Sequence, residues 1–118
     1  MEKDRSKREA GITGENLAAD FLLKNGYSIL ARNHRIRIGE IDIIALKEET
    51  IHFIEVKHWT SPGYSDPLET FTPKKIKRMR AAAADYLRRD RSLQNYFVSF
   101  CLVSVGEKRE LNFYLNLF

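Results

Sequence analysis

The feature that most constrains the fold is a pair of β-prone segments, residues 39–46 and 51–57, separated by only four polar residues. Both segments are rich in β-branched and aromatic side chains, so together they predict a β-hairpin. With the turn centred between Glu48 and Glu49, the register places Asp42 opposite Glu55. Apolar residues occupy both faces of this hairpin, which predicts a sheet covered on both sides in a layered α/β domain.

The hairpin also concentrates charge at one point. Because side chains alternate with a period of two residues, Asp42, Glu55 and Lys57 share one face. Carboxylates directly opposite each other destabilise a sheet unless a cation, a shared proton or a pKa shift relieves the repulsion. A divalent metal meets this need, and an Asp…Glu-x-Lys arrangement is typical of metal-dependent nucleases. The structural alternative is a Glu40–Lys57 ion pair, with Asp42 in water at a strand entrance.

Positive charge is concentrated between residues 74 and 91. This segment holds eight basic and two acidic residues, a net charge of +6, whereas the whole chain carries +4, so the remainder carries −2. Such a cluster is the footprint expected of a protein that binds the phosphate backbone of nucleic acids. An ordinary solvated helix face is the alternative. The candidate contacts are Lys74, Lys75, Lys77 and Arg78, joined by Arg35 and Arg37 before the hairpin. Lys75, in the first turn of a predicted helix, is expected to point at the acids.

The length of 118 residues is sufficient for one domain with a modest core. Residues 1–10 are almost all charged or polar and predict a flexible, solvated tail, with the domain over residues 11–118. The single cysteine, Cys101, excludes an internal disulfide and a cysteine-rich zinc site. Without an apolar run of spanning length or a signal-peptide pattern, we expect a cytoplasmic protein with no membrane partner.

Capping signals and periodicity predict the remaining elements. A first helix is expected between Thr13 as N-cap and a stop at Asn25–Gly26, and a second helix begins at Pro73 after Thr72 as N-cap. Strands are expected at residues 27–32, 95–105 and from residue 111 onward. Between hairpin and second helix, residues 58–72 predict a long loop. Its aromatic residues, Trp59, Tyr64 and Phe71, either stack on bases or pin the loop to the core.

The resulting order, αβββαββ, matches the restriction-endonuclease-like core, an α/β fold with a mixed central sheet flanked by helices in three layers. More closely, the chain resembles the YraN family of small bacterial proteins. The matching residues are Gly14–Glu15, Ala18, Gly26–Tyr27, Asn33, Arg35, the run 39–42, the run 53–57, the run 72–75 and Tyr86–Leu87. The chain departs from the family pattern at His58–Trp59, where Thr-Arg is usual, and at residues 99–101, where Arg-Phe-Asp is usual.

The resemblance implies a PD-(D/E)xK endonuclease similar to Holliday-junction resolvases, acting on structured DNA. Glu15, which by spacing alone is a helix-dipole partner, becomes a site residue. The implied metal is Mg²⁺, with Mn²⁺ as an alternative, held by Asp42 and Glu55 together with Glu15 and the Val56 carbonyl, while Lys57 assists the attacking water. Since resolvases act as dimers, a homodimer is expected by analogy. The alternative is a non-catalytic nucleic-acid-binding or protein-interaction module that retains the fold.

Overall fold

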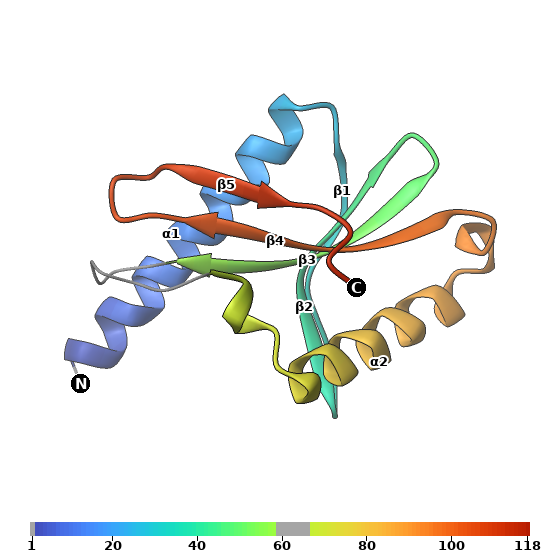
Figure 1. Cartoon of the computed structure of the whole chain (residues 1–118), viewed down its shortest axis with the longest axis horizontal. Helices are drawn as coiled ribbons and strands as arrows, with labels where there is room; N and C mark the ends of the chain where they lie inside the picture. Colours follow the sequence, from blue (N-terminus) through green and yellow to red (C-terminus); the bar gives the residue numbers. More distant parts are fainter. Residues whose placement is uncertain (1, 59–66) are drawn as a thin grey trace.

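The computed structural model describes the backbone of residues 2–58 and 67–118 and the side chains of residues 13–58 and 68–118. The predicted order of helices and strands is confirmed (Figure 1). In chain order the elements are α1 (Glu2–Lys24), β1 (Ser28–Ile36), β2 (Gly39–Lys47), β3 (Thr50–His58), the 3₁₀ turn η1 (Pro67–Thr70), α2 (Pro73–Arg89), the 3₁₀ turn η2 (Arg91–Leu93), β4 (Phe97–Val105) and β5 (Leu111–Tyr114).

The five strands form one mixed sheet in the order β1-β2-β3-β4-β5. Neighbouring strands are antiparallel except β3 and β4, which are parallel. Parallel neighbours need a crossover connection, and here α2 lies in the segment that supplies it. The mixed sheet flanked by helices is the predicted architecture, and it places the C-terminal ends of β3 and β4 at the same edge.

Two apolar cores, one on each face of the sheet, hold the three layers together (Figure 1). Adjacent residues of one strand contribute to different cores: Ile43 packs with α1 through Ala18 and Leu22, whereas Ile44 packs with α2 through Met79. This alternation is why the hairpin sequence is apolar at nearly every position. Each buried aliphatic side chain contributes about 1.5–3 kcal/mol of transfer free energy, so both faces need a helix.

The first helix ends as predicted but begins elsewhere. Gly26 has a φ of 85°, and the N–H groups of Gly26 and Tyr27 donate to the carbonyls of Leu23 and Leu22, which is a Schellman ending. At the other end α1 begins at Glu2 and runs through the segment predicted as a tail, so Thr13 is not its N-cap. The Glu, Lys and Arg residues of this segment are good helix formers, and opposite charges recur at helical spacing.

The predicted hairpin register is confirmed where the two strands pair. Leu46 lies opposite Ile51 and Ile44 opposite Phe53, and the ladder ends at Ile43–Ile54. Asp42 is the next residue of β2, so it lies where the two strands stop pairing. The site described below begins at this point.

The end of the β1–β2 pair lies against α2. Asn33 has a φ of 53°, a left-handed conformation that asparagine tolerates better than most residues. On its two sides, Arg32 contacts α1 and His34 contacts α2. The backbone at Gly39 approaches Arg78 so closely that a Cβ atom there would overlap with the Arg78 carbonyl oxygen. Glycine at position 39 therefore permits the contact.

We expect Gly39→Ala to destabilise the fold by about 1–3 kcal/mol, because the overlapping atom belongs to the backbone and cannot rotate away. Urea unfolding measures this loss. The neighbouring Ile38→Ala is the matched control, since the Ile38 side chain is 60% exposed and should change stability by less than about 0.5 kcal/mol. Equal stability of Gly39→Ala and the wild type would show that the turn does not rest on α2 in solution.

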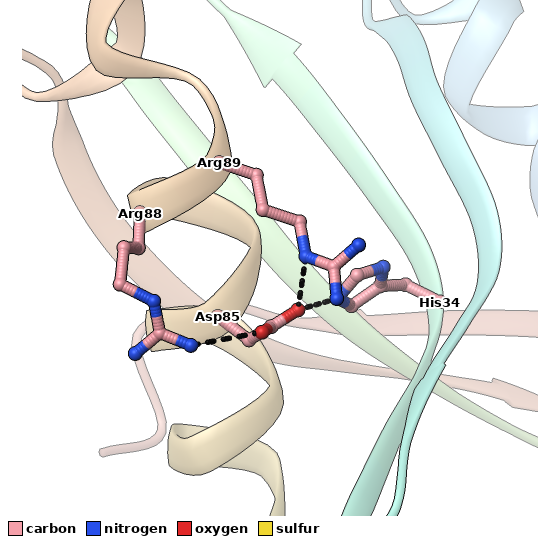
Figure 2. Close-up of polar contacts among 4 residues, drawn as sticks. All are labelled: His34, Asp85, Arg88 and Arg89. Atoms are coloured by element: carbon pink, nitrogen blue, oxygen red, sulfur yellow. Dashed lines mark hydrogen bonds and ion pairs between the residues drawn. The ribbon is translucent and has the colours of Figure 1, made fainter.

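A polar cluster joins β1 to the C-terminal half of α2 (Figure 2). His34 Nε2 and Arg89 Nε lie 3.2 Å and 2.9 Å from Asp85 Oδ2, and Arg88 Nη2 lies 3.0 Å from Asp85 Oδ1. Burial raises the pKa of Asp85, but the Arg89 charge, the hydrogen bonds from Arg89 and His34, and the Arg88 charge lower it below its ordinary value of 3.8. His34, Arg88 and Arg89 therefore have a structural role, as partners of the Asp85 carboxylate.

The remaining sequence predictions concern buried polar groups and the long loop. Cys101 is buried, and burial raises the pKa of its thiol. Of the loop aromatics, Phe71 packs in the core on the α2 side, with its ring centroid 5.2 Å from that of Phe118. Trp59 and Tyr64 lie outside the described residues.

Within the described chain, neither long helix has an apolar stretch sufficient to cross a bilayer.

Candidate functional site

The site is built around Asp42, at the point where β2 and β3 separate. Its Oδ2 accepts a hydrogen bond of 2.8 Å from the backbone N–H of Val56. The side chain thus satisfies a donor of β3 just beyond the last paired residues of the ladder. This contact holds the Asp42 carboxyl against β3 beside Glu55, which is only 8% exposed.

The electrostatics of Asp42 show how close these acids lie. Burial, followed by the charge of Glu55, raises the pKa of Asp42 from 3.8 to about 7. Donation from the Val56 N–H and the charge of Lys75 lower it, while the charge of Glu15 raises it further. The charges of Glu55, Glu15 and Lys75, all predicted from sequence as site residues, therefore act on Asp42.

Lys75 provides the nearest cation. Its Nζ lies 3.0 Å from Glu55 Oε2, and the two side chains are 29% and 10% exposed. Within the described chain, Glu55 Oε2 accepts no hydrogen bond. Its contact with Lys75 Nζ is therefore an ion pair that lacks the geometry of a hydrogen bond. The N-cap predicted at Thr72 places the lysine, because Thr72 Oγ1 accepts from the Lys75 N–H at 3.1 Å. Lys75 points at the acids, as its position in the helix predicted.

Glu15 reaches the site from α1. Its Oε1 lies 3.2 Å from Arg32 Nε, and Arg32 Nη2 donates to Asn16 Oδ1 at 2.8 Å. The preceding residue is Gly14, where a Cβ atom would lie 3.0 Å from His58 Cβ, so glycine lets α1 approach the end of β3. The ion pair between Arg32 and Glu15 is not predicted by the sequence. Because Glu15 and Arg32 are 17 positions apart in the sequence, no local pattern indicates this pair.

The other residues predicted from sequence lie on β1, β3 and α2 or directly after β1. Lys57 is exposed on β3, two residues after Glu55, and pairs in register with Ser104 of β4. Glu40 forms an ion pair with Arg35, with Nε and Oε2 3.0 Å apart. Among the predicted nucleic-acid contacts, the exposed residues are Lys74, Lys77 and Arg78 on α2, Arg35 on β1 and Arg37 directly after β1.

The donor set suits a magnesium ion held mainly by water. In the described part of the chain, no group of three or more histidine, cysteine, aspartate or glutamate side chains lies close enough to hold one ion. Glu15 is directed toward Arg32, which leaves Asp42 and Glu55 as the adjacent pair. Mg²⁺ is commonly bound by one or two carboxylates and keeps several waters. The unbonded Glu55 Oε2, already drawn to an ammonium group, is an oxygen suited to a cation.

Comparison with known proteins gives the family. Residues 14–105 match the family model described as "Uncharacterised protein family UPF0102". The chain belongs to the UPF0102 family. Its sequence is 47% identical to a UPF0102 protein of Leptospira interrogans over 112 residues, covering 95% of this chain and 97% of the relative. A UPF0102 protein of Clostridium perfringens is 43% identical over 116 residues, covering 94% of each chain.

UPF0102 membership confirms the resemblance to the YraN family. The matched region extends from the residue before Glu15 to the end of β4. It therefore includes Asp42, Glu55 and Lys57 as well as Lys75. Strand β5, at residues 111–114, lies outside the match, and none of the residues discussed for the site comes from it.

Proposed function

We propose that this UPF0102 protein is a Mg²⁺-dependent endonuclease that hydrolyses phosphodiester bonds in structured DNA. The observation that supports it is the juxtaposition of Asp42 and Glu55 at the end of the β2–β3 ladder. Burial and the charge of Glu55 make the ionised form of Asp42 costly, and a structural role alone gives no reason to hold two carboxylates together there. A divalent cation removes this cost, and metal sites of nucleases require such a pair.

Each residue of the site would have a separate role in catalysis. Asp42 and Glu55 would hold the metal, with Glu15 acting through water and the Val56 carbonyl as a further ligand. When bound, Mg²⁺ would stabilise negative charge on the phosphate and favour deprotonation of water. Lys57 would orient the attacking water and donate to a phosphate oxygen as charge develops there. Val56 keeps Asp42 in place through its N–H group.

The basic residues of α2 and β1 would hold the nucleic-acid backbone. Lys74, Lys77 and Arg78 are exposed on α2, and Arg37 is exposed at the end of β1. Contacts of this kind set position and orientation without identifying bases. Selection would therefore depend on the shape or strandedness of the substrate.

The test is cleavage of branched, flapped, single-stranded and duplex DNA, and of RNA, with Mg²⁺, Mn²⁺ or EDTA. We expect cleavage only with metal, and a rate at least about 100-fold lower in Glu55→Gln and Lys57→Met. Glu107→Gln, an exposed acid in the β4–β5 turn, is the control that should retain the wild-type rate. Cleavage that survives Glu55→Gln would place the activity elsewhere. Salt-dependent binding without any cleavage would instead support the non-catalytic nucleic-acid-binding alternative.

A further inference from the structure

A pocket of about 310 Å³ lies between the turn that joins β1 to β2 and the first half of α2. Residues 35–40 line one side, and Lys75, Arg78 and Met79 line the other. In Figure 1 the tip of β2 lies beside α2, and the close contact between Gly39 and the Arg78 carbonyl fixes this arrangement. The pocket is thus part of the packed fold.

The charges of this pocket are unequal. It contains four basic residues, Arg35, Arg37, Lys75 and Arg78, against one acid, Glu40. Glu40 pairs with Arg35, and Lys75 pairs with Glu55 outside the pocket. Arg37 and Arg78 are exposed, and neither forms an ion pair with any carboxylate in the described residues. Two guanidinium groups therefore remain available for an anion.

We propose that this pocket binds a terminal phosphate, the phosphomonoester at the end of a nucleic-acid strand. The inference rests on the proposed nucleic-acid substrate and names the part of it that is recognised. A phosphomonoester carries about −1.5 to −2 charges at pH 7 and three free oxygens, whereas a phosphate within the strand carries one charge. Two available guanidinium groups match the dianion, and each can bind two oxygens.

The size of the pocket supports a strand end over a continuous duplex. Its volume is at the lower limit of the range of about 300–1,000 Å³ typical of small-ligand pockets. The end of one strand fits this volume, whereas a length of continuous duplex does not. Lys75 lines the pocket and also contacts Glu55, so an end held here lies next to the proposed metal site.

The experiment measures binding of one single-stranded DNA sequence in three forms, with a 5′-phosphate, a 3′-phosphate or hydroxyl groups at both ends. Fluorescence anisotropy in EDTA excludes cleavage during the measurement. We expect one phosphorylated form to bind the wild type roughly 10-fold to 100-fold more tightly than the hydroxyl form, the range given by charge-assisted hydrogen bonds. Which form it is tells whether the pocket takes a 5′ or a 3′ end.

The double variant Arg37→Gln/Arg78→Gln should lose this preference. Lys74→Gln/Lys77→Gln removes the same charge from exposed positions of α2 that do not line the pocket, so it should weaken all three forms equally and retain the preference. Equal binding of the three forms by the wild type would overturn the proposal, as would equal loss of preference in both double variants. Cleavage of DNA without a preference for phosphorylated ends would refute only the proposed phosphate pocket. A preference for phosphorylated ends without any cleavage would refute only the proposed nuclease activity.

Discussion

Asp42→Asn should abolish Mg²⁺ binding and at the same time stabilise the metal-free protein at alkaline pH. The substitution keeps a side-chain oxygen that can accept the Val56 N–H but removes the charge that Glu55 and burial oppose. A gain in stability from loss of a functional group is expected where a site stores unfavourable charge.

The pH dependence follows from the raised pKa of Asp42. The ordinary pKa of 3.8 applies to the unfolded chain and the value of about 7 to the folded one, so between these values the folded state binds more protons. Wild-type stability therefore falls as pH rises through this window and levels off above it. The shift corresponds to a penalty of the order of 2–4 kcal/mol above pH 7. Asp42→Asn should regain that amount above pH 7 and nothing below pH 4.

Urea unfolding in EDTA between pH 4 and pH 8 measures the stability, and calorimetric titration with Mg²⁺ measures the binding. Asp20→Asn, an exposed acid on α1, is the control and should follow the wild type at every pH. Wild-type Mg²⁺ affinity in Asp42→Asn would remove Asp42 from the metal site. A variant no more stable than the wild type at pH 8 would show that the carboxyl is not strained in the metal-free fold.

Lys75→Gln should destabilise the metal-free protein and make its stability depend on Mg²⁺. The lysine Nζ lies 3.0 Å from Glu55 Oε2, and its charge also lowers the pKa of Asp42. Removing it leaves two adjacent carboxylates with less compensation. Breaking a fully buried pair costs about 3–5 kcal/mol. Because Lys75 is 29% exposed, we expect a loss of about 1–3 kcal/mol.

Mg²⁺ should restore much of this loss, since a bound cation compensates the same charges. Thermal unfolding is measured without Mg²⁺ and with about 10 mM Mg²⁺. The rise in Tm that Mg²⁺ causes should be larger for Lys75→Gln than for the wild type. Lys74→Gln, the exposed neighbour on α2, should behave as the wild type. An equal rise in both proteins would mean that Lys75 and the metal act on different groups.

Local patterns in the sequence were sufficient for the framework of this protein. The alternation of the hairpin predicted its register, and the Thr72 cap with Pro73 predicted the start of α2. These features depend on the conformation of a few neighbouring residues and on which face each side chain occupies. The same logic failed at the start of α1, where a charged segment without an apolar stripe is nonetheless helical.

Two arrangements were decided only by the tertiary structure. Arg32 pairs with Glu15, and the turn at Gly39 packs on α2 to form the basic pocket. Each depends on the distance between elements far apart in the chain. That distance is set by how closely helix and sheet backbones can approach, as at Gly14 and Gly39. Sequence alone determined which charged groups the protein has, and packing determined which of them meet.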